Sequence, residues 1–471
     1  MSGKLEFIFI HDSSGSLVEG NWNRVLFANL SSGEIWVDHY EPDVWKENLG
    51  GVGLGLFIFE KIAKYVAPLS PDNPLVFTVG PLTGTVFPNT GRYSVVSRSP
   101  LNGAIAEGNG GGFIGNEIKR AGFDAIVILG AADAPSILRI GNKIRIEERP
   151  ELWGKNYFHT EAKLRSEDGS RVAGIGRAGE NCISIAAIIN DGGRAVARGG
   201  LGAVMGSKKL KAITVRGGKE IPLNDQRSFF QVSRRTCDQL VGLTQVNSDK
   251  NSSTAYASPV ARPSYSLPRK DNDAHCANCV TGCPRAGGLK WDYLGSPEPQ
   301  TIASLLPFTD GRDFEQIARW NYYLNDAGLD TLSMSKVLSI LKLGIHEDGL
   351  TPSGGNREDH FVHKVEDIFR NVENGDASIM PFVLEATTPE NFPDLLGKTN
   401  KKQSTGTNKI TSMDEIYNSL IVCKFAKLGI DTLSEALRFS TGLDYSSDSL
   451  LASASLIAKR RESLNKKMDE F

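Results

Sequence analysis

Cysteine, histidine, methionine and tryptophan are all scarce in this chain, with 6, 7, 6 and 6 copies among 471 residues. So few cysteines in a chain of this length, with no secretory signal, argue against a disulfide framework. Residues 5–10 are too short for the core of a signal peptide, and no apolar run approaches the roughly 20 residues of a membrane span. The sequence therefore predicts a cytoplasmic protein with no membrane-spanning helix.

An excess of charge of either sign is also lacking. The chain carries 53 basic and 55 acidic residues, which leaves a formal net charge of −2. Basic residues are scattered except at 208–209 and 459–461, so there is no broad positive field of the kind that binds nucleic acid. The chain is 40% hydrophobic and contains 49 glycines. We therefore expect a globular protein of two or three domains that has no nucleic-acid partner.

The two halves of the chain differ in their apolar periodicity. Short β-type runs between glycines dominate residues 20–218, whereas longer runs with a helical period follow Pro222. This pattern predicts an α+β protein with a strand-rich N-terminal domain followed by mainly helical domains. The expected boundaries are 1–218, 219–385 and 386–471. The predicted strands cover residues 24–28, 34–37, 75–79, 93–97, 125–129, 143–146 and 212–215, and the predicted helices cover 314–325, 333–343 and 434–439.

Half of the cysteines lie in one short run, Cys276-Ala-Asn-Cys279-Val-Thr-Gly-Cys283, which Pro284 follows. A Cys-x2-Cys-x3-Cys loop can supply three thiolates to a [4Fe–4S] cluster, which needs a fourth from elsewhere. Cys423 is the obvious candidate for that fourth ligand. Structural zinc is the alternative, although zinc usually takes paired knuckles and no second knuckle exists here. Cys182 and Cys237 are expected to be ordinary thiols, at least partly buried.

Three glycine-dense segments, at 50–55, 108–115 and 192–202, can bring backbone N–H groups close to phosphate. The third also contains Arg194 and Arg198, two fixed cations that suit a diphosphate, although a sharp surface turn would look similar. The second contains Gly-x-Gly-x-x-Gly, a formal dinucleotide fingerprint. That fingerprint is weak, because residues 104–108 before it make a poor buried strand.

Together these segments resemble the tungsten-dependent aldehyde ferredoxin oxidoreductase family. The longest matching run is Asn-Asp-Gly-Gly-Arg-Ala-Val-Ala-Arg-Gly-Gly-Leu-Gly-Ala-Val-Met-Gly-Ser-Lys-Lys-Leu-Lys-Ala-Ile at 190–213. The resemblance spans about residues 22–425. Its other motifs lie, in the family's order, at 78–85, 91–93, 99–103, 109–115, 176–181, the cysteine loop, 297–305, 325–331 and 418–425.

The resemblance implies a tungsten, or less often molybdenum, held by two pterin cofactors beside a [4Fe–4S] cluster. Cys276, Cys279, Cys283 and Cys423 match the four cluster ligands of the family. By the same similarity, Arg92 and Arg194 contact the pterin phosphates, Gly111 lets backbone approach them, and Asn109 with the Ala195 carbonyl binds a bridging Mg²⁺, a cation that prefers oxygen ligands. Asn325, Asp330 and Asn418 stand in the pterin-contacting motifs.

The chain departs from the family pattern near the expected metal. Gln300 replaces a glutamate and cannot act as a general acid or base. Glu298 is the nearest remaining carboxylate and is our candidate base. Asn325 and Asn418 stand where aspartates are common. The catalytic histidine of some members has no counterpart that we can align, because the stretch between Thr331 and Asn418 and the tail after Cys423 are both shorter than is usual.

Two functions are therefore expected. In the first, the chain is an enzyme that oxidises an aldehyde-like substrate and passes electrons to ferredoxin or a partner subunit. In the second, it is an inactive family member that serves as an electron-transfer or structural subunit of a larger complex. A homodimer or a hetero-oligomer fits either function. Arg319 replaces the glutamate that binds an interfacial metal in some members, so we expect no such metal here.

Overall fold

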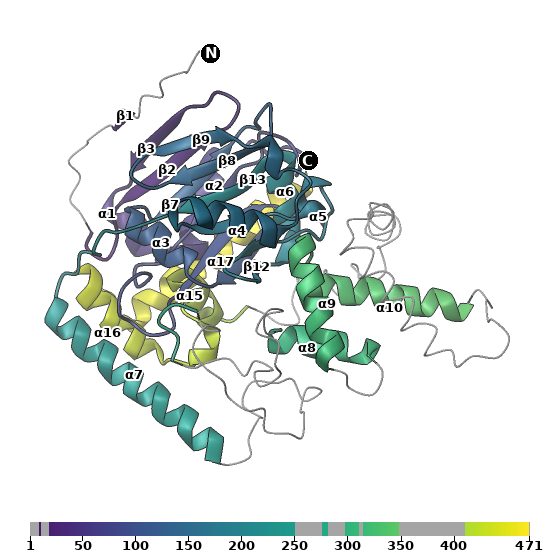
Figure 1. Ribbon diagram of the computed structural model, residues 1–471. Helices are drawn as coiled ribbons and strands as arrows, with labels where there is room; N and C mark the ends of the chain where they lie inside the picture. The colour runs from purple at the N-terminus through teal and green to yellow at the C-terminus, as the bar shows by residue number, and fades with distance from the viewer. Residues whose placement is uncertain are drawn as a thin grey trace.

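Two β-sheets make up the first half of the chain (Figure 1). The computed structural model describes residues 9–10, 18–249, 276–280, 297–309, 314–347 and 410–470. The seven-stranded sheet has the order β1 (Phe9–Ile10), β3 (Ile35–His39), β2 (Arg24–Asn29), β7 (Ala125–Leu129), β4 (Leu75–Thr78), β5 (Arg92–Arg98) and β6 (Ile105–Gly111). The six-stranded sheet has the order β12 (Arg194–Val196), β11 (Ile188–Asn190), β10 (Arg171–Gly174), β13 (Leu210–Val215), β8 (Ser136–Ile140) and β9 (Ile144–Glu148).

The two sheets share one apolar core. Strands β4 and β13 are buried along their whole length, because their runs of Leu, Val, Ile and Phe are covered on both faces. Helices α3 (Ile114–Ala121) and α6 (Leu201–Ser207) add side chains such as Ile118 and Met205 to this core. The predicted strands are confirmed, with bounds within one or two residues. The expected α+β class is confirmed as well.

We interpreted residues 104–108 as a poor buried strand, but residues 105–108 form the first half of β6, in which buried and half-buried residues alternate. Its seven residues pair with β5 in an unbroken antiparallel register from Arg92↔Gly111 to Arg98↔Ile105. Pairing along the whole strand overrides the low strand propensity of its glycines. The segment is also no dinucleotide fold. Strands β6 and β7 run in opposite directions, because three antiparallel pairings separate them, so α3 does not connect parallel strands.

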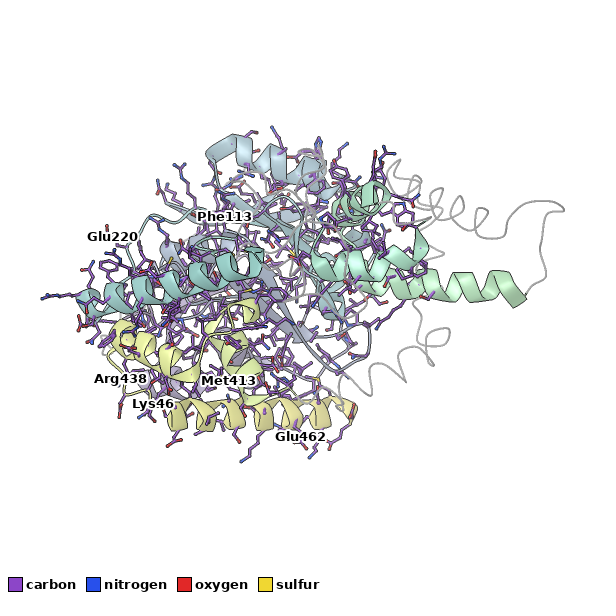
Figure 2. The ribbon with its side chains drawn as sticks, turned by 90° about the horizontal axis from the view of Figure 1, so that it is seen from below. Lys46, Phe113, Glu220, Met413, Arg438 and Glu462 are labelled. Atoms are coloured by element: carbon purple, nitrogen blue, oxygen red, sulfur yellow. The ribbon has the colours of Figure 1, made fainter. Side chains whose placement is uncertain are left out.

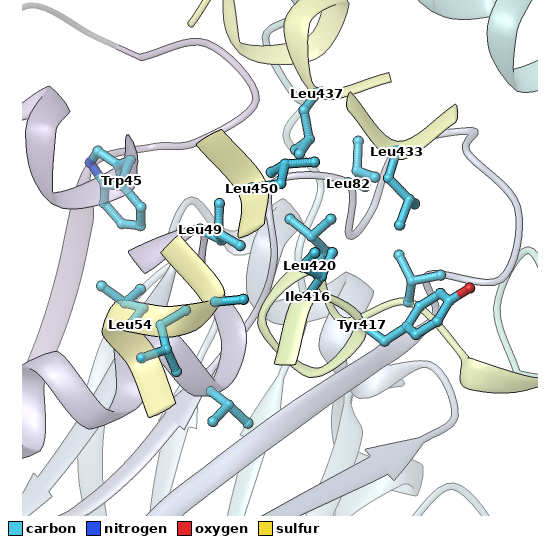
Figure 3. Close-up of a cluster of buried hydrophobic side chains, with 14 of the residues drawn as sticks. Trp45, Leu49, Leu54, Leu82, Ile416, Tyr417, Leu420, Leu433, Leu437 and Leu450 are labelled. Carbon is cyan, nitrogen blue, oxygen red and sulfur yellow. The ribbon is translucent and has the colours of Figure 1, made fainter. Parts of the chain in front are cut away.

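Helices from both ends of the chain form a second core, shown in Figure 3. Leu54 of α2 (Gly51–Ile62), Leu420 of α15 (Ser412–Leu420), Leu437 of α16 (Ile430–Thr441) and Leu450 of α17 (Ser447–Asp469) are fully buried there. The core also takes in α1 (Pro42–Asn48) and α7 (Gln226–Asp249). Figure 2, seen from below, shows α15 and α16 between the long helices α7 and α17. The division into three domains stays a prediction.

Three further helices form a third apolar core. Helices α8 (Pro299–Leu305), α9 (Phe314–Ala327) and α10 (Thr331–Glu347) extend away from the sheets in Figure 1. They pack through residues such as Leu305, Trp320 and Leu338 against α5 (Arg177–Glu180) and the segment after it. The remaining described helix of more than one turn, α4 (Tyr157–Asp168), lies on β10. The helices predicted after Pro222 are confirmed as α9, α10 and α16, each longer than expected.

Ionisable side chains with little or no exposure connect segments that are far apart in the sequence. Arg461 of α17 lies between Glu107 of β6 and Glu415 of α15 and donates hydrogen bonds to both. Lys208 donates to the carbonyls of Pro71 and Gly130, at 2.7 and 3.0 Å. Burial lowers the pKa of Lys208 to about 7. No described helix is long and apolar enough to cross a membrane.

Candidate functional site

Residues of the predicted phosphate and Mg²⁺ sites lie together at the open end of the β5–β6 hairpin. Arg92 opens β5 and lies directly opposite Gly111, because the two residues pair across the ladder. The guanidinium of Arg92 also donates to the Asn109 carbonyl at 3.1 Å. The register therefore brings together Arg92, the predicted phosphate contact, Asn109, the predicted Mg²⁺ ligand, and Gly111, where backbone was predicted to approach the phosphates.

The cysteine loop lies against this edge of the sheet. A Cβ on Gly111 would be 2.7 Å from the sulfur of Cys276, and a Cβ on Gly91 would be 2.3 Å from the Ala277 carbonyl oxygen. The Ala277 N–H donates to the Gly112 carbonyl at 3.0 Å. Glycine is needed at 91 and 111 because only a residue without a side chain allows this close approach. Cys276 is thereby held next to the predicted phosphate site.

Cys423 reaches the same region from the far end of the chain. Its N–H donates to the Asn89 carbonyl at 2.9 Å, and the Asn89 N–H donates to the Asn278 carbonyl in the cysteine loop at 2.8 Å. Cys276, Cys279 and Cys423 are all half-buried and form no disulfide. Cys283, the remaining predicted ligand, lies outside the described residues. Cys182 and Cys237 are half-buried thiols elsewhere, and burial raises the pKa of Cys182.

Within the described ranges, no group of three or more His, Cys, Asp or Glu side chains is arranged around a single metal ion. In a [4Fe–4S] cluster the thiolates bind separate irons, so they stand around a larger group. Cys276, Cys279 and Cys423 are free, half-buried thiols, two on the cysteine loop and one connected to it through Asn89, so they have the chemistry of cluster ligands.

The Asn109 amide has the chemistry expected of a ligand for a hard cation. Its Nδ2 donates to Oδ1 of Asn418 at 2.9 Å. Its Oδ1 is buried and has no hydrogen-bond partner among the described residues. An unpaired buried acceptor is costly unless something binds it, and Mg²⁺ prefers such oxygen ligands. Ala195 approaches from β12, where the next residue, Val196, lies 2.3 Å from where a Cβ on Gly108 would be. The Asn109 oxygen thus has the chemistry of a Mg²⁺ ligand, whereas the role of the Ala195 carbonyl stays a prediction.

Arg194 is nearly buried and forms an ion pair with Glu298 at 3.0 Å. The Glu298 side chain is 54% exposed and directly precedes α8, whereas Gln300 is exposed on the first turn of that helix. The structure therefore brings the candidate base Glu298 to the arginine that was predicted to bind phosphate. Gln300 and Glu298 stay predictions as catalytic residues.

Asn325 and Asp330 flank the turn between α9 and α10. Asn325 is 5% exposed, and its Nδ2 would lie 3.1 Å from a Cβ on Gly193, beside Arg194. Asp330 is 1% exposed and accepts hydrogen bonds from the Leu332 N–H and the Ser333 hydroxyl, at 3.1 and 2.5 Å. Burial raises the pKa of Asp330, and the nearby Arg198 opposes that effect. Asn325 therefore lies at the glycine-dense segment 192–202. Asp330 directly precedes α10, and its carboxylate accepts hydrogen bonds from the first turn of that helix.

Several residues of the site were not singled out from the sequence. Asn190 donates to the Gly111 carbonyl at 2.7 Å, and one oxygen of Asp191 accepts the N–H groups of Phe113 and Ile114, at 2.7 and 3.0 Å. Both residues lie at the start of the longest matching motif, 190–213, so that motif could have identified them as site residues. Asn89 lay between two motifs and carried no such signal.

Comparison with known protein families gives two matches. The N-terminal domain of aldehyde ferredoxin oxidoreductase matches residues 25–217, and domains 2 and 3 of the same family match residues 245–378. The structure also superposes on the active-site complex BamBC of benzoyl-coenzyme A reductase, in complex with 1,5-dienoyl-CoA, with a TM-score of 0.72. That superposition covers 96% of this chain and 89% of the other at 19% identity, so it speaks for the fold alone.

Individual relatives agree with the family matches. The chain is 37% identical over 350 residues to the tungsten-containing aldehyde ferredoxin oxidoreductase of Pyrococcus furiosus, covering 68% of this chain and 58% of that protein. The tungsten-containing enzyme of Thermococcus kodakarensis is also 37% identical, over 352 residues with the same coverage of both chains. The WOR-like subunit of the P. furiosus aliphatic sulfonate oxidoreductase is 26% identical over 363 residues, 67% of this chain and 58% of that one. This chain thus spans about 58% of the length of these curated relatives.

Proposed function

Because this chain belongs to the aldehyde ferredoxin oxidoreductase family, we propose that it is a tungsten or molybdenum bis-pterin oxidoreductase with a [4Fe–4S] cluster. It oxidises an aldehyde-like substrate and passes the electrons to ferredoxin or to a partner subunit. One observation carries the proposal: Cys276 lies directly against Gly111 of β6, and the same strand carries Asn109, whose side-chain oxygen has no hydrogen-bond partner among the described residues. The contact supports the proposal because the predicted cluster and the predicted phosphate site have to be neighbours in such an enzyme.

The chain's own residues would bind and orient the cofactor. Arg92 and Arg194 supply fixed positive charge for the pterin phosphates, and Asn109 with the Ala195 carbonyl supplies oxygen ligands for Mg²⁺. Asn325, Asp330 and Asn418 supply acceptors for pterin N–H groups. When bound, the metal–pterin group supplies the redox chemistry that amino-acid side chains cannot perform.

Glu298 links the phosphate site to the candidate acid–base chemistry. In the structure its carboxylate pairs with the Arg194 guanidinium at 3.0 Å, where we expect the pterin phosphate to bind. A pterin phosphate would compete for the same guanidinium and free the carboxylate to accept a proton from substrate or water. Glu298→Gln should then lower kcat with the cofactor still bound. Undiminished turnover in that variant would remove Glu298 from the mechanism.

Gln300 favours a second candidate function. An amide at this position can donate and accept hydrogen bonds but cannot transfer a proton at neutral pH. A chain that keeps the cluster but has lost catalysis would serve as an electron-transfer or structural subunit. The two candidates differ in metal content, since only the first requires tungsten or molybdenum.

Elemental analysis of the anaerobically purified protein tests the proposal. We expect one tungsten or molybdenum, two pterins and about four irons per chain. Iron without either heavy metal would replace the enzyme by the electron-transfer or structural subunit, and zinc alone would overturn the cluster. Arg194→Gln should reduce the pterin content, whereas Arg319→Gln should not, because Arg319 is exposed and pairs with Glu315 on α9.

A further inference from the structure

The three described cysteines around the predicted cluster come from segments far apart in the sequence, and one residue connects those segments. We propose that Asn89 is a positioning residue that holds Cys423 in register with the cysteine loop and so sets the geometry and lifetime of the iron–sulfur cluster. The inference rests on the proposed function, because it concerns the same cluster. It goes further by assigning a role to a residue that is neither a ligand nor part of a matched motif.

Asn89 makes three hydrogen bonds to the two cysteine-bearing segments. Its N–H donates to the Asn278 carbonyl at 2.8 Å, and its carbonyl accepts the Cys423 N–H at 2.9 Å. Its side-chain Oδ1 accepts the Val280 N–H at 2.9 Å, across a sequence separation of 191 residues. The residue is only 2% exposed. Both segments are thus fixed to one buried residue of the loop between β4 and β5.

The bonds to Asn89 hold the backbone on both sides of the ligands. Asn278 and Val280 flank Cys279, and the Cys423 N–H belongs to a ligand itself. The amide of Asn278 returns a hydrogen bond to the Thr85 carbonyl of the same loop. Thr90 is fixed by a hydrogen bond from its hydroxyl to the Phe87 carbonyl, at 2.9 Å. The loop is therefore ordered by its own contacts and serves as a rigid support for both segments.

The conformation of Asn89 explains why this residue type stands there. Its φ is +62°, in the left-handed region that asparagine, aspartate and glycine adopt more easily than other residues. Its side chain must also offer an oxygen to Val280. Glycine meets the first requirement alone, and aspartate meets both. Alanine meets neither, so an alanine variant would mix strain with the lost hydrogen bond.

This difference supplies a clean pair of variants. Asn89→Gly removes the side-chain acceptor without straining the backbone, and Asn89→Asp restores an acceptor at the same place. Asn102→Gly is the matched control, because Asn102 also accepts a backbone N–H through Oδ1, from Ala104 at 3.2 Å. Asn102 is exposed and lies at the opposite end of the β5–β6 hairpin from Arg92.

The experiment uses the anaerobically purified holoprotein. Iron and acid-labile sulfide are counted per chain, iron loss to an excess of a coloured chelator is followed in time, and the EPR spectrum and midpoint potential of the cluster are recorded. We expect Asn89→Gly to lose iron about five to ten times faster, the factor that corresponds to one buried hydrogen bond, and to show an altered EPR spectrum. Asn89→Asp should lose iron at a rate within about twofold of that of the unsubstituted protein. The control Asn102→Gly should do the same and should keep the same EPR spectrum.

Equal rates and identical spectra for Asn89→Gly and Asn102→Gly would overturn the inference and leave the proposed function intact. Failure of Asn89→Asp to restore the rate would also overturn it, because the acceptor would then not be the cause. If the unsubstituted protein carries no iron–sulfur cluster, the proposed function fails first and this role of Asn89 fails with it. Circular dichroism on every variant shows that the fold is retained.

Discussion

The contact between Gly111 and Cys276 gives a direct test of how the cysteine loop is positioned. In Gly111→Ala the new methyl carbon would lie 2.7 Å from the Cys276 sulfur, whereas unstrained contacts of this kind are about 3.5–4.0 Å. The thiol would have to retreat by about 1 Å. Loop residue Ala277 is held by its hydrogen bond to Gly112 and by its close contact with Gly91. The loop therefore cannot simply move away.

We expect Gly111→Ala to lower the free energy of unfolding by about 1–3 kcal/mol, the usual cost of overpacking. Chemical denaturation of the metal-free protein measures that cost, and iron analysis of the holoprotein should show a reduced iron content. Gly141→Ala is the control, because nothing lies within 4 Å of a Cβ there and neither glycine has a positive φ. The alanine itself should not destabilise β6, since losing glycine reduces the entropy of the unfolded chain.

A double variant identifies the cause. Cys276→Ala removes the sulfur, so adding Gly111→Ala to that variant should change the free energy of unfolding little. The coupling free energy of the two substitutions should then approach the full cost of Gly111→Ala alone. If Gly111→Ala is as stable and as rich in iron as Gly141→Ala, the loop is not pressed against the sheet as described. If the cost persists without the sulfur, another contact of Gly111 is responsible.

Three further predictions concern stability, each measured by chemical denaturation. Leu420→Ala should cost about 2–5 kcal/mol because the side chain is fully buried, whereas Leu451→Ala, 41% exposed, should cost under about 0.5 kcal/mol; equal costs would contradict the helical core. Arg461→Met should cost about 3–5 kcal/mol, since Glu415 stays buried without its partner, and adding Glu415→Gln should recover part of it. Burial lowers the pKa of Lys208 to about 7 from the unfolded value of 10.5. The unfolded chain therefore binds the extra proton between those pH values, and stability should rise with pH there, by up to about 1.4 kcal/mol per unit relative to Lys208→Met; parallel pH profiles would contradict a neutral buried lysine.

Much of the strand pattern could be predicted from the sequence because it is local. Runs such as 125–129 are apolar, rich in β-branched residues and bounded by turn residues, so the same residues predict both burial and a strand. Strand β6 was missed for the opposite reason. Its residues 105–111 include three glycines and look unfavourable in isolation, and only the ladder with β5 makes them a strand.

The site was predictable where a motif carries chemistry and unpredictable where a contact joins distant segments. The cysteine spacing and the motif around Asn109 pointed to residues that the structure brings to one edge of the sheet. The hydrogen bonds of Asn89 could not be foreseen, because an asparagine in a loop shows no preference for a particular partner in another segment. The pairing of Glu298 with Arg194 likewise depends on how α8 approaches the glycine loop.

The core that joins both ends of the chain has a consequence for how the protein is made. The hydroxyl of Tyr445 donates to the Trp45 carbonyl across 400 residues, and that of Ser453 donates to the Lys46 carbonyl across 407. At about 5–20 residues per second, a ribosome finishes the later partner roughly 20 to 80 seconds after the earlier one. During that interval the apolar faces of α1 and α2 have no cover from α15 or α17, so the nascent chain should need a chaperone until synthesis passes these helices.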